Sequence, residues 1–298
     1  MRNPDRILIR TDLVTVGRFR CPVDHPWFRD SGPIRQSCIV FPRTAVVIEH
    51  AGTRPFVGDP ALATLYNAGQ QYERRAISPQ GDHCDWYAVA TGVLCDAVRP
   101  LDPAAADNPS RAMRHQHTPI APALYLEQRR LFRSLERLVD DAGDGAGHGR
   151  VADASVDQLE VDERVISLLN RVLHTAYQRP ATTDSPAAGG RARRQRAEIG
   201  HAAREVVARM FTERVTLAAL ARAVGCSPFH LCRSFREFTG SSVHAHLTAL
   251  RLRTAIDHLE QGASITRVAI DAGFSSHSHF TAAFRQSFGV TPSSVIRM

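Results

Sequence analysis

The sequence contains no lysine, so all 37 of its basic residues are arginine. It also lacks any run of about 18 uncharged apolar residues, the length that a membrane-spanning helix needs. Residues 1–6 are polar and lead into a short apolar alternation, not into the apolar core of a signal peptide. These absences predict a cytoplasmic protein without a membrane segment. Hydrophobic residues make up 43% of the 298 positions, which excludes a largely disordered or collagen-like chain.

Motifs that carry catalysis are missing as well. We find no paired carboxylates, no nucleophile elbow and no glycine-rich loop that cradles phosphate. None of the six cysteines forms a C-x-x-C pair, and in a cytosolic chain we expect them to be reduced. The sequence therefore predicts a protein that is not an enzyme and that needs neither a cofactor nor a metal.

The positive charge lies in the last third of the chain. Residues 191–298 contain fifteen arginines and seven acidic residues, whereas residues 1–190 contain 22 and 23. Such a concentration is typical of a region that binds a polyanion such as nucleic acid. A solvated basic face without a partner gives the same composition, so charge alone does not decide between the two.

The first third of the chain has the pattern of a β domain. Short apolar runs alternate with turns that contain glycine and proline from about residue 6 to residue 100, at the spacing of a small sandwich or barrel. These runs are residues 7–9, 13–16, 37–41, 45–48 and 85–90. Residues 100–120 are expected to be a connecting loop.

Two helices are predicted between residues 122 and 176. Leu124, Leu131, Leu135 and Leu138 form the apolar face of the first, and a second begins near Ser155 and includes Leu159. Together they form a helical hairpin that either covers the β domain or supplies a homodimer contact through residues 124–175. The first interpretation has somewhat more weight.

A linker separates this region from the rest. Residues 179–190 are rich in Pro, Gly, Ser and Thr and have no apolar periodicity. We therefore predict an N-terminal sensing or dimerisation domain over 1–178, this linker, and a C-terminal domain over 191–298. The fold class is α+β, with a cupin-like sandwich or barrel and a helical hairpin followed by an all-α domain.

The C-terminal domain contains an internal repeat. Leu217–Gly225 aligns with Ile265–Gly273 at an offset of 48, and beyond the glycine the offset becomes 49. Each copy has the pattern of a helix-turn-helix: a small buried residue (Ala221 or Ala269), a glycine that ends the first helix, and a serine N-cap. The N-cap is Ser227 in the first copy and Ser275 or Ser276 in the second. Two copies in a basic region are much stronger evidence for DNA binding than one.

The second copy carries the most specific signature. It reads Val268-Ala269-x3-Gly273-Phe274-Ser275-Ser276, and later Phe288-Gly289-Val290-Thr291-Pro292. With these motifs, residues 191–298 resemble the DNA-binding domain of the AraC/XylS family of bacterial transcription regulators. Ser242 and His246 depart from the family, which often has Pro and Tyr there. The resemblance implies two recognition helices placed in successive major grooves by a connecting helix over about 243–261, with promoter DNA and RNA polymerase as partners.

Base-reading residues follow from the resemblance, position by position. In the first recognition helix they are Phe229, Cys232 and Arg233, and in the second they are His277, Ser278, Thr281 and Ala282. Arg233 suits a bidentate contact to guanine, although a phosphate contact remains an alternative, as core packing does for Phe229. Arg236 and Arg285 are expected to contact phosphate.

The sequence leaves several alternatives for the signal that the N-terminal domain senses. A small organic effector is the expectation from the family layout, although the cupin metal signature is absent: His115 and His117 lack the Glu and Gly that should follow. Cys21, Cys38 and Cys84 lie beside polar residues, among them His83, and arginine neighbours can lower a thiol pKa. A thiol- or metal-responsive switch is therefore an alternative, with separate buried cysteines as the simpler reading. A DNA-alkylation-repair regulator needs a tighter cysteine cluster, and a nonspecific architectural protein would prefer no site.

Overall fold

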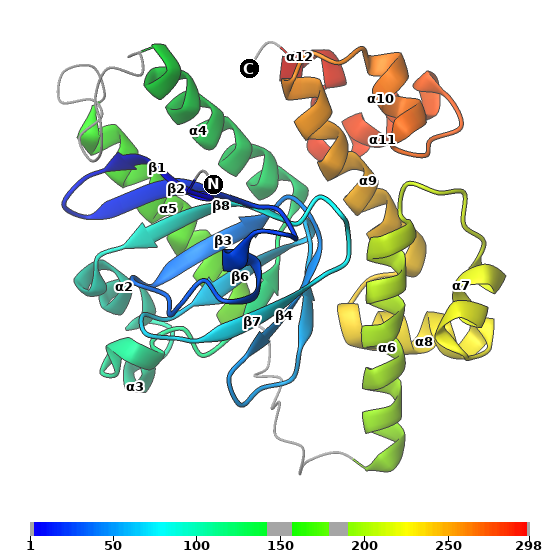
Figure 1. Cartoon of the computed structure of the whole chain (residues 1–298), viewed down its shortest axis with the longest axis horizontal. Helices are drawn as coiled ribbons and strands as arrows, with labels where there is room; N and C mark the ends of the chain where they lie inside the picture. The colour runs from blue at the N-terminus through cyan, green and yellow to red at the C-terminus, as the bar shows by residue number, and fades with distance from the viewer. Residues whose placement is uncertain (1–2, 142–156, 179–189, 297–298) are drawn as a thin grey trace.

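The computed structural model describes residues 3–141, 157–178 and 190–296. Two antiparallel sheets with flanking helices form the N-terminal region (residues 3–178), and the C-terminal region (residues 190–296) is helical throughout its described part (Figure 1). The expected linker, apart from Gly190, lies outside the described residues. Within the described ranges, no helix is long and apolar enough to cross a membrane.

Nine strands form the two sheets, in agreement with the expected α+β layout. The larger sheet has the strand order β1-β2-β8-β3-β6-β9 and the smaller sheet the order β5-β4-β7, and neighbouring strands in both are antiparallel. The strands are β1 Asp5–Arg10, β2 Val14–Cys21, β3 Cys38–Pro42, β4 Val46–His50, β5 Phe56–Gly58, β6 Leu62–Tyr66, β7 Tyr72–Ala76, β8 Asp82–Val89 and β9 His117–Pro119.

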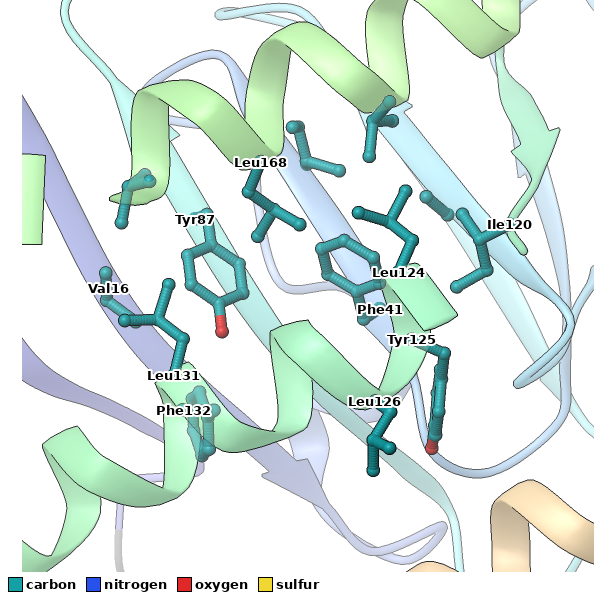
Figure 2. Packing of buried hydrophobic residues seen from close by; sticks show 14 of the residues in the cluster. Val16, Phe41, Tyr87, Ile120, Leu124, Tyr125, Leu126, Leu131, Phe132 and Leu168 are labelled. Carbon is teal, nitrogen blue, oxygen red and sulfur yellow. The ribbon is translucent and has the colours of Figure 1, made fainter. Parts of the chain in front are cut away.

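The larger sheet is apolar where β2 begins and β8 ends, and it is mixed at the opposite end of the two strands. Val14 of β2 lies opposite Val89 of β8 at the apolar end, and Cys21 lies opposite Asp82 at the other end. Residues paired in this way share a face of the sheet, and successive residues of a strand point to opposite faces. Helices α4 (Pro122–Asp141) and α5 (Gln158–Tyr177) cover one face, where Tyr87 and Phe41 pack edge to face with ring centroids 5.7 Å apart (Figure 2). The core of the N-terminal region therefore lies between this sheet and the two helices.

The helical hairpin packs within the chain. Leu124, Leu131 and Leu168 belong to the same buried cluster as Phe41 and Tyr87 (Figure 2). The interpretation in which the hairpin covers the β domain is confirmed. The assignment of Leu159 to the apolar face of the second helix is wrong. Leu159 is 75% exposed, because it lies in the first turn of α5, before the buried face of the helix begins at Val161.

The segment between the sheet and the hairpin differs from expectation. The series of strands is interrupted at Val89 instead of near residue 100, since α2 (Thr91–Val98) follows at once. The predicted loop over 100–120 contains α3 (Pro103–Ala106), a short 3-10 helix η1 (Pro109–Arg111) and the edge strand β9. The first two begin with proline, which suits the first helical position, and their shortness leaves no periodicity to detect.

Seven helices make up the described C-terminal region. They are α6 Arg191–Met210, α7 Leu217–Val224, α8 Pro228–Thr239, α9 Val243–Glu260, α10 Ile265–Asp271, α11 His277–Phe288 and α12 Pro292–Ile296. In the N-terminal region, the short helix α1 (Pro26–Arg29) covers part of the smaller sheet. The long α6 and α9 frame two shorter helix pairs (Figure 1).

Candidate nucleic-acid interface

Helices α7 and α8 form the first helix-turn-helix, which we call unit 1 (residues 217–239). Gly225 ends α7 with φ of 76°, a backbone conformation that disfavours residues with a Cβ. Ser227 then caps α8 by accepting a hydrogen bond from the His230 backbone N–H, and Pro228 occupies the first helical position. Ala221 is buried where α8 crosses, as the sequence predicted.

Helices α10 and α11 form unit 2 (residues 265–288) with the same mechanics. Gly273 has φ of 80°, and a Cβ on it would lie 2.8 Å from the carbonyl oxygen of Thr212, so both conformation and space require glycine. Of the two serines that could cap the second helix, Ser276 does so: it accepts from the His279 backbone N–H at 3.1 Å. The buried pair Phe280 and Phe284 holds α11 in place, with ring centroids 5.6 Å apart.

One continuous helix, α9, joins the two units. It has 18 residues, which corresponds to about 27 Å. Its N-cap is Ser242, whose side chain accepts from the Ala245 N–H, and His246 is buried against Phe235 with ring centroids 5.4 Å apart. The two departures from the family pattern therefore cap and pack the connecting helix. A rigid helix of this length suits two recognition helices that enter grooves about 34 Å apart.

The expected base-reading residues of unit 1 lie on the surface of α8. Phe229 is 69% exposed, Cys232 is exposed, and Arg233 donates from Nε to Glu237 at 2.9 Å. Core packing is therefore excluded for Phe229 in this structure.

The corresponding residues of unit 2 are less uniform. His277, Ser278 and Ala282 are exposed on α11, whereas Thr281 is half-buried. The Thr281 hydroxyl oxygen is buried and has no hydrogen-bond partner within the described part of the chain. A base contact by Thr281 thus needs its side chain to rotate outward.

Arg236 and Arg285, the expected phosphate contacts, occupy matching positions in the last turns of α8 and α11. Both are exposed, and neither takes part in an ion pair with another described residue. Their guanidinium groups are therefore available to an external anion.

Glu237 is a residue of this surface that the sequence reasoning missed. Its carboxylate accepts from Arg233 of α8 and lies 2.7 Å from Nε of Arg196 on α6. These two arginines hold the pKa of Glu237 below its usual value. The i, i+4 spacing of residues 233 and 237 was the available signal.

The cysteines do not form a sensing cluster. Cys21, Cys38 and Cys84 are buried, and burial raises the pKa of Cys21 to about 11, that of Cys38 to about 12 and that of Cys84 well above its usual value. The expectation that arginine neighbours lower these values is wrong, because loss of solvent outweighs the nearby charge. His83 is half-buried, and burial followed by Arg20 lowers its pKa. Among the residues that the structure describes, no three metal-binding side chains come together.

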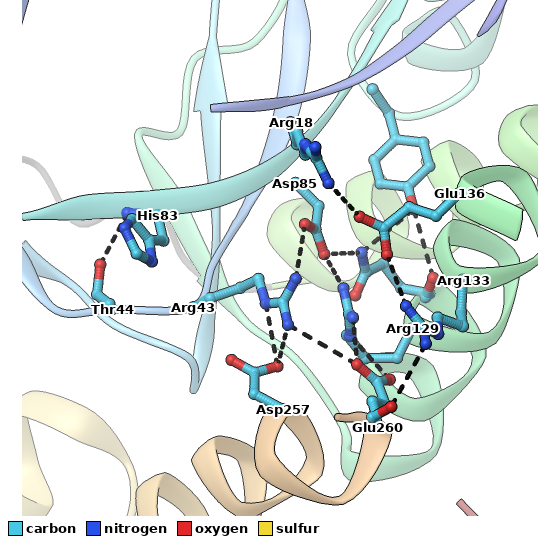
Figure 3. A network of polar contacts seen from close by, with 12 residues as sticks. Arg18, Arg43, Thr44, His83, Asp85, Arg129, Arg133, Glu136, Asp257 and Glu260 are labelled. Atoms are coloured by element: carbon cyan, nitrogen blue, oxygen red, sulfur yellow. Dashed lines mark hydrogen bonds and ion pairs between the residues drawn. The ribbon is translucent and has the colours of Figure 1, made fainter. Parts of the chain in front are cut away.

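A buried network of charges joins the N-terminal region to α9 (Figure 3). Arg129 of α4 is 1% exposed and bridges Asp85 of β8 and Glu260, the last residue of α9. Arg43 lies beside it and donates to Asp257 from Nη2 at 2.5 Å. Arg43 and Asp257 are 214 positions apart in the sequence, and Arg129 and Glu260 are 131 apart. No local sequence pattern could therefore predict this network.

A second polar contact holds α6 and α9 to the N-terminal region. The buried carboxylate of Asp59 accepts from Nε of Arg204 at 2.8 Å and lies 3.3 Å from Nε2 of His246. Burial alone raises the pKa of Asp59, but Arg204 and His246 together hold it well below its usual value. We call these three residues the Asp59 clamp.

Comparison with known proteins gives the same assignment for both units. A family model described as "Helix-turn-helix domain" matches residues 220–298. The regulator GlxA of Rhizobium meliloti is 35% identical over 201 residues, which cover 64% of this chain and 60% of that protein. The bifunctional transcriptional activator and DNA repair enzyme Ada of Escherichia coli is 39% identical over 77 residues, or 26% of this chain and 22% of Ada.

This chain thus spans less than two thirds of the length of these relatives. Among solved structures, a transcriptional regulator with an AraC-type DNA-binding domain from Chromobacterium violaceum is 28% identical, with a TM-score of 0.32 over 33% of this chain and 89% of that chain. The family match covers the units whose caps, glycines and buried pairs were described above. Residues 220–298 of this chain therefore form a helix-turn-helix domain.

Proposed function

We propose that the protein is a sequence-specific transcription regulator that binds promoter DNA through units 1 and 2. One observation carries the proposal: two helix-turn-helix units with exposed recognition faces are held by a single helix of about 27 Å. Bases are read by Phe229, Cys232 and Arg233 of unit 1, and more weakly by the second helix, where Ala282 offers only a methyl group. Arg236 and Arg285 anchor the phosphate backbone.

The N-terminal region, in this proposal, is a sensing domain over residues 1–178. The support is its position: its buried charges hold the last turn of α9, and the Asp59 clamp holds α6. A signal that alters these contacts changes how the two units are presented to DNA. Contact with RNA polymerase, self-association and a cytoplasmic location complete the proposal on the resemblance to the family.

The thiol- or metal-responsive alternative has little support, since the three thiols are buried with raised pKa values. DNA repair belongs to the names of two relatives, Ada of Escherichia coli and AdaA of Bacillus subtilis, whose matches cover 77 and 89 residues only. We therefore do not extend it to this chain.

Selection of genomic DNA fragments on the purified protein at moderate salt tests the proposal. A recovered motif with two half-sites about one helical turn apart is the expected result. The Arg233→Ala variant serves as the control, because it should lose the motif and retain weak general binding. Binding without any enriched motif, in the presence of cell extract as a source of effectors, would contradict sequence-specific recognition.

A further inference from the structure

A groove of about 520 Å³ lies beside the first two strands, away from the recognition helices. Its lining includes three arginines, Arg6 of β1 and Arg18 and Arg20 of β2, and one acidic residue, Asp24. None of the residues assigned to DNA contact lines this groove.

The three arginines share one face of the larger sheet. Arg6 lies directly opposite Arg18 in the antiparallel register, and Arg20 follows Arg18 by two residues. Like charges directly opposite each other destabilise a strand pair. The arrangement is therefore unfavourable for folding unless something else compensates these charges.

Compensation by the protein is incomplete. Arg18 donates to Glu136 at 2.9 Å, but among the residues that the structure describes Arg6 reaches only the exposed Asp140, at 3.9 Å. Arg20 has no ion pair or side-chain hydrogen bond within the described residues. Partial burial lowers the pKa of Arg20, and the charges of Arg18 and Arg43 lower it further, while Glu136 and Asp85 act in the opposite direction.

We propose that this groove binds a small anion with at least two negative charges, a polycarboxylate or a phosphate compound. Guanidinium groups present pairs of parallel donors that match the oxygens of carboxylate and phosphate. Arg6 and Arg20 are the principal contacts, and Arg18 divides its donors between the anion and Glu136.

The groove is also connected to the DNA-binding region by a continuous chain of contacts (Figure 3). Glu136 lies between Arg18 and Arg133 of α4, at 2.9 and 3.5 Å. Arg133 in turn donates to the backbone oxygen of Glu260 at the end of α9. An anion that draws Arg18 from Glu136 alters this chain, so its binding changes affinity for DNA; this coupling rests on the proposed function.

Isothermal titration of the full chain at fixed ionic strength tests the site, with inorganic pyrophosphate and citrate as separate probes. Binding of pyrophosphate alone identifies a phosphate site, and binding of citrate alone identifies a carboxylate site. Arg6→Ala and Arg20→Ala should each weaken the bound probe by roughly tenfold or more. Arg10→Ala, an exposed arginine on the same strand outside the groove lining, is the matched control and should bind as the unmodified chain does.

Three results would overturn the proposal. The first is no binding of either probe at millimolar concentration, and the second is equal weakening by Arg10→Ala, which indicates general charge screening. The third is a loss of DNA affinity in Arg20→Ala without any small anion, which makes the groove a DNA contact. If a saturating concentration of the probe leaves the affinity for DNA unchanged, the coupling between the anion site and DNA binding is refuted. If the protein binds no DNA at all, the proposed function is refuted and the anion site is not.

Discussion

Units 1 and 2 have the same local design but different surroundings. In unit 1, Leu231 and Phe235 belong to a separate apolar cluster with Ala203 and Val207 of α6. In unit 2, Phe280 and Phe284 belong to the large cluster that also contains the core of the N-terminal region, and α4 contacts α11. Unit 1 is therefore built on its own supporting helix, whereas unit 2 shares a core with the sheet.

The links to the N-terminal region differ accordingly. Near unit 1 the main contacts are the Asp59 clamp and Ala208 of α6 against the smaller sheet. Near unit 2 an apolar core is reinforced by the charges around Arg129. A change in the N-terminal region should reach unit 2 first, and the following predictions test this difference.

Removal of a core phenylalanine should have the largest effect. Phe284→Ala and Phe235→Ala each delete a fully buried ring and should cost about 3–5 kcal/mol in the free energy of unfolding of the affected part. In hydrogen exchange, Phe284→Ala should expose amides of both unit 2 and α4, whereas Phe235→Ala should expose only unit 1, α6 and the adjoining turns of α9. Identical exchange patterns would contradict the difference between the units.

Arg129→Met should have the second-largest effect on the free energy of unfolding, because it leaves Asp85 and Glu260 buried with fewer partners. We expect a loss of about 3 kcal/mol. Chemical denaturation measures it, and hydrogen exchange should show the last turn of α9 opening while unit 1 stays protected. Arg171→Met is the control: its pair with Glu127 is half-exposed and should contribute less than about 1 kcal/mol.

The Asp59 clamp should make the contact near unit 1 sensitive to acid. The pKa of Asp59 is lowered in the folded state, so its contribution is complete above about pH 4, the pKa of an unfolded aspartate, and is lost as the pH falls further. Asp59→Asn should cost roughly 1–3 kcal/mol at neutral pH and flatten the loss of stability below pH 4. Unfolding midpoints between pH 3 and pH 7 measure this. Asp12→Asn, at an exposed position, should follow the unmodified chain.

The smallest effects concern DNA itself. Arg233→Ala should weaken binding to the selected site by about 1–3 kcal/mol and binding to random DNA far less. Arg285→Ala should weaken both equally and reduce the salt dependence by about one unit. Fluorescence anisotropy at several salt concentrations distinguishes the two. Equal loss of specific and random binding in Arg233→Ala would show that this arginine contacts phosphate.

The helix-turn-helix units could be predicted because their rules are local. Gly225, Ser227 and the pair Leu231 and Phe235 all lie within eleven residues, and each acts through the backbone turn next to it. Apolar runs also indicated four strands of the larger sheet, β1, β2, β3 and β8, but not β6 or β9. The repeat helped further, since it showed the same signals twice.

The contacts between the two regions could not be predicted in the same way. Arg129 and Glu260 are 131 positions apart, and Arg204 and Asp59 are 145 apart. Which charge meets which depends on how the regions pack, and nothing in a single sequence reports that. The prediction for Cys21, Cys38 and Cys84 was wrong for a related reason. Their neighbours in the sequence are polar, but each cysteine lies in a strand that directs its thiol into the interior.

The continuous helix α9 restricts how the length of this chain can change. Each residue added to an α-helix turns everything beyond it by about 100° and moves it by about 1.5 Å. A single insertion would therefore direct the second recognition helix away from the DNA face that the first one uses. Seven added residues nearly restore the direction but separate the units by a further ~10 Å, about a third of a DNA turn. Neighbouring side chains can adjust to a substitution in α9. No small insertion or deletion, however, preserves both the relative direction of the two recognition helices and the distance between them.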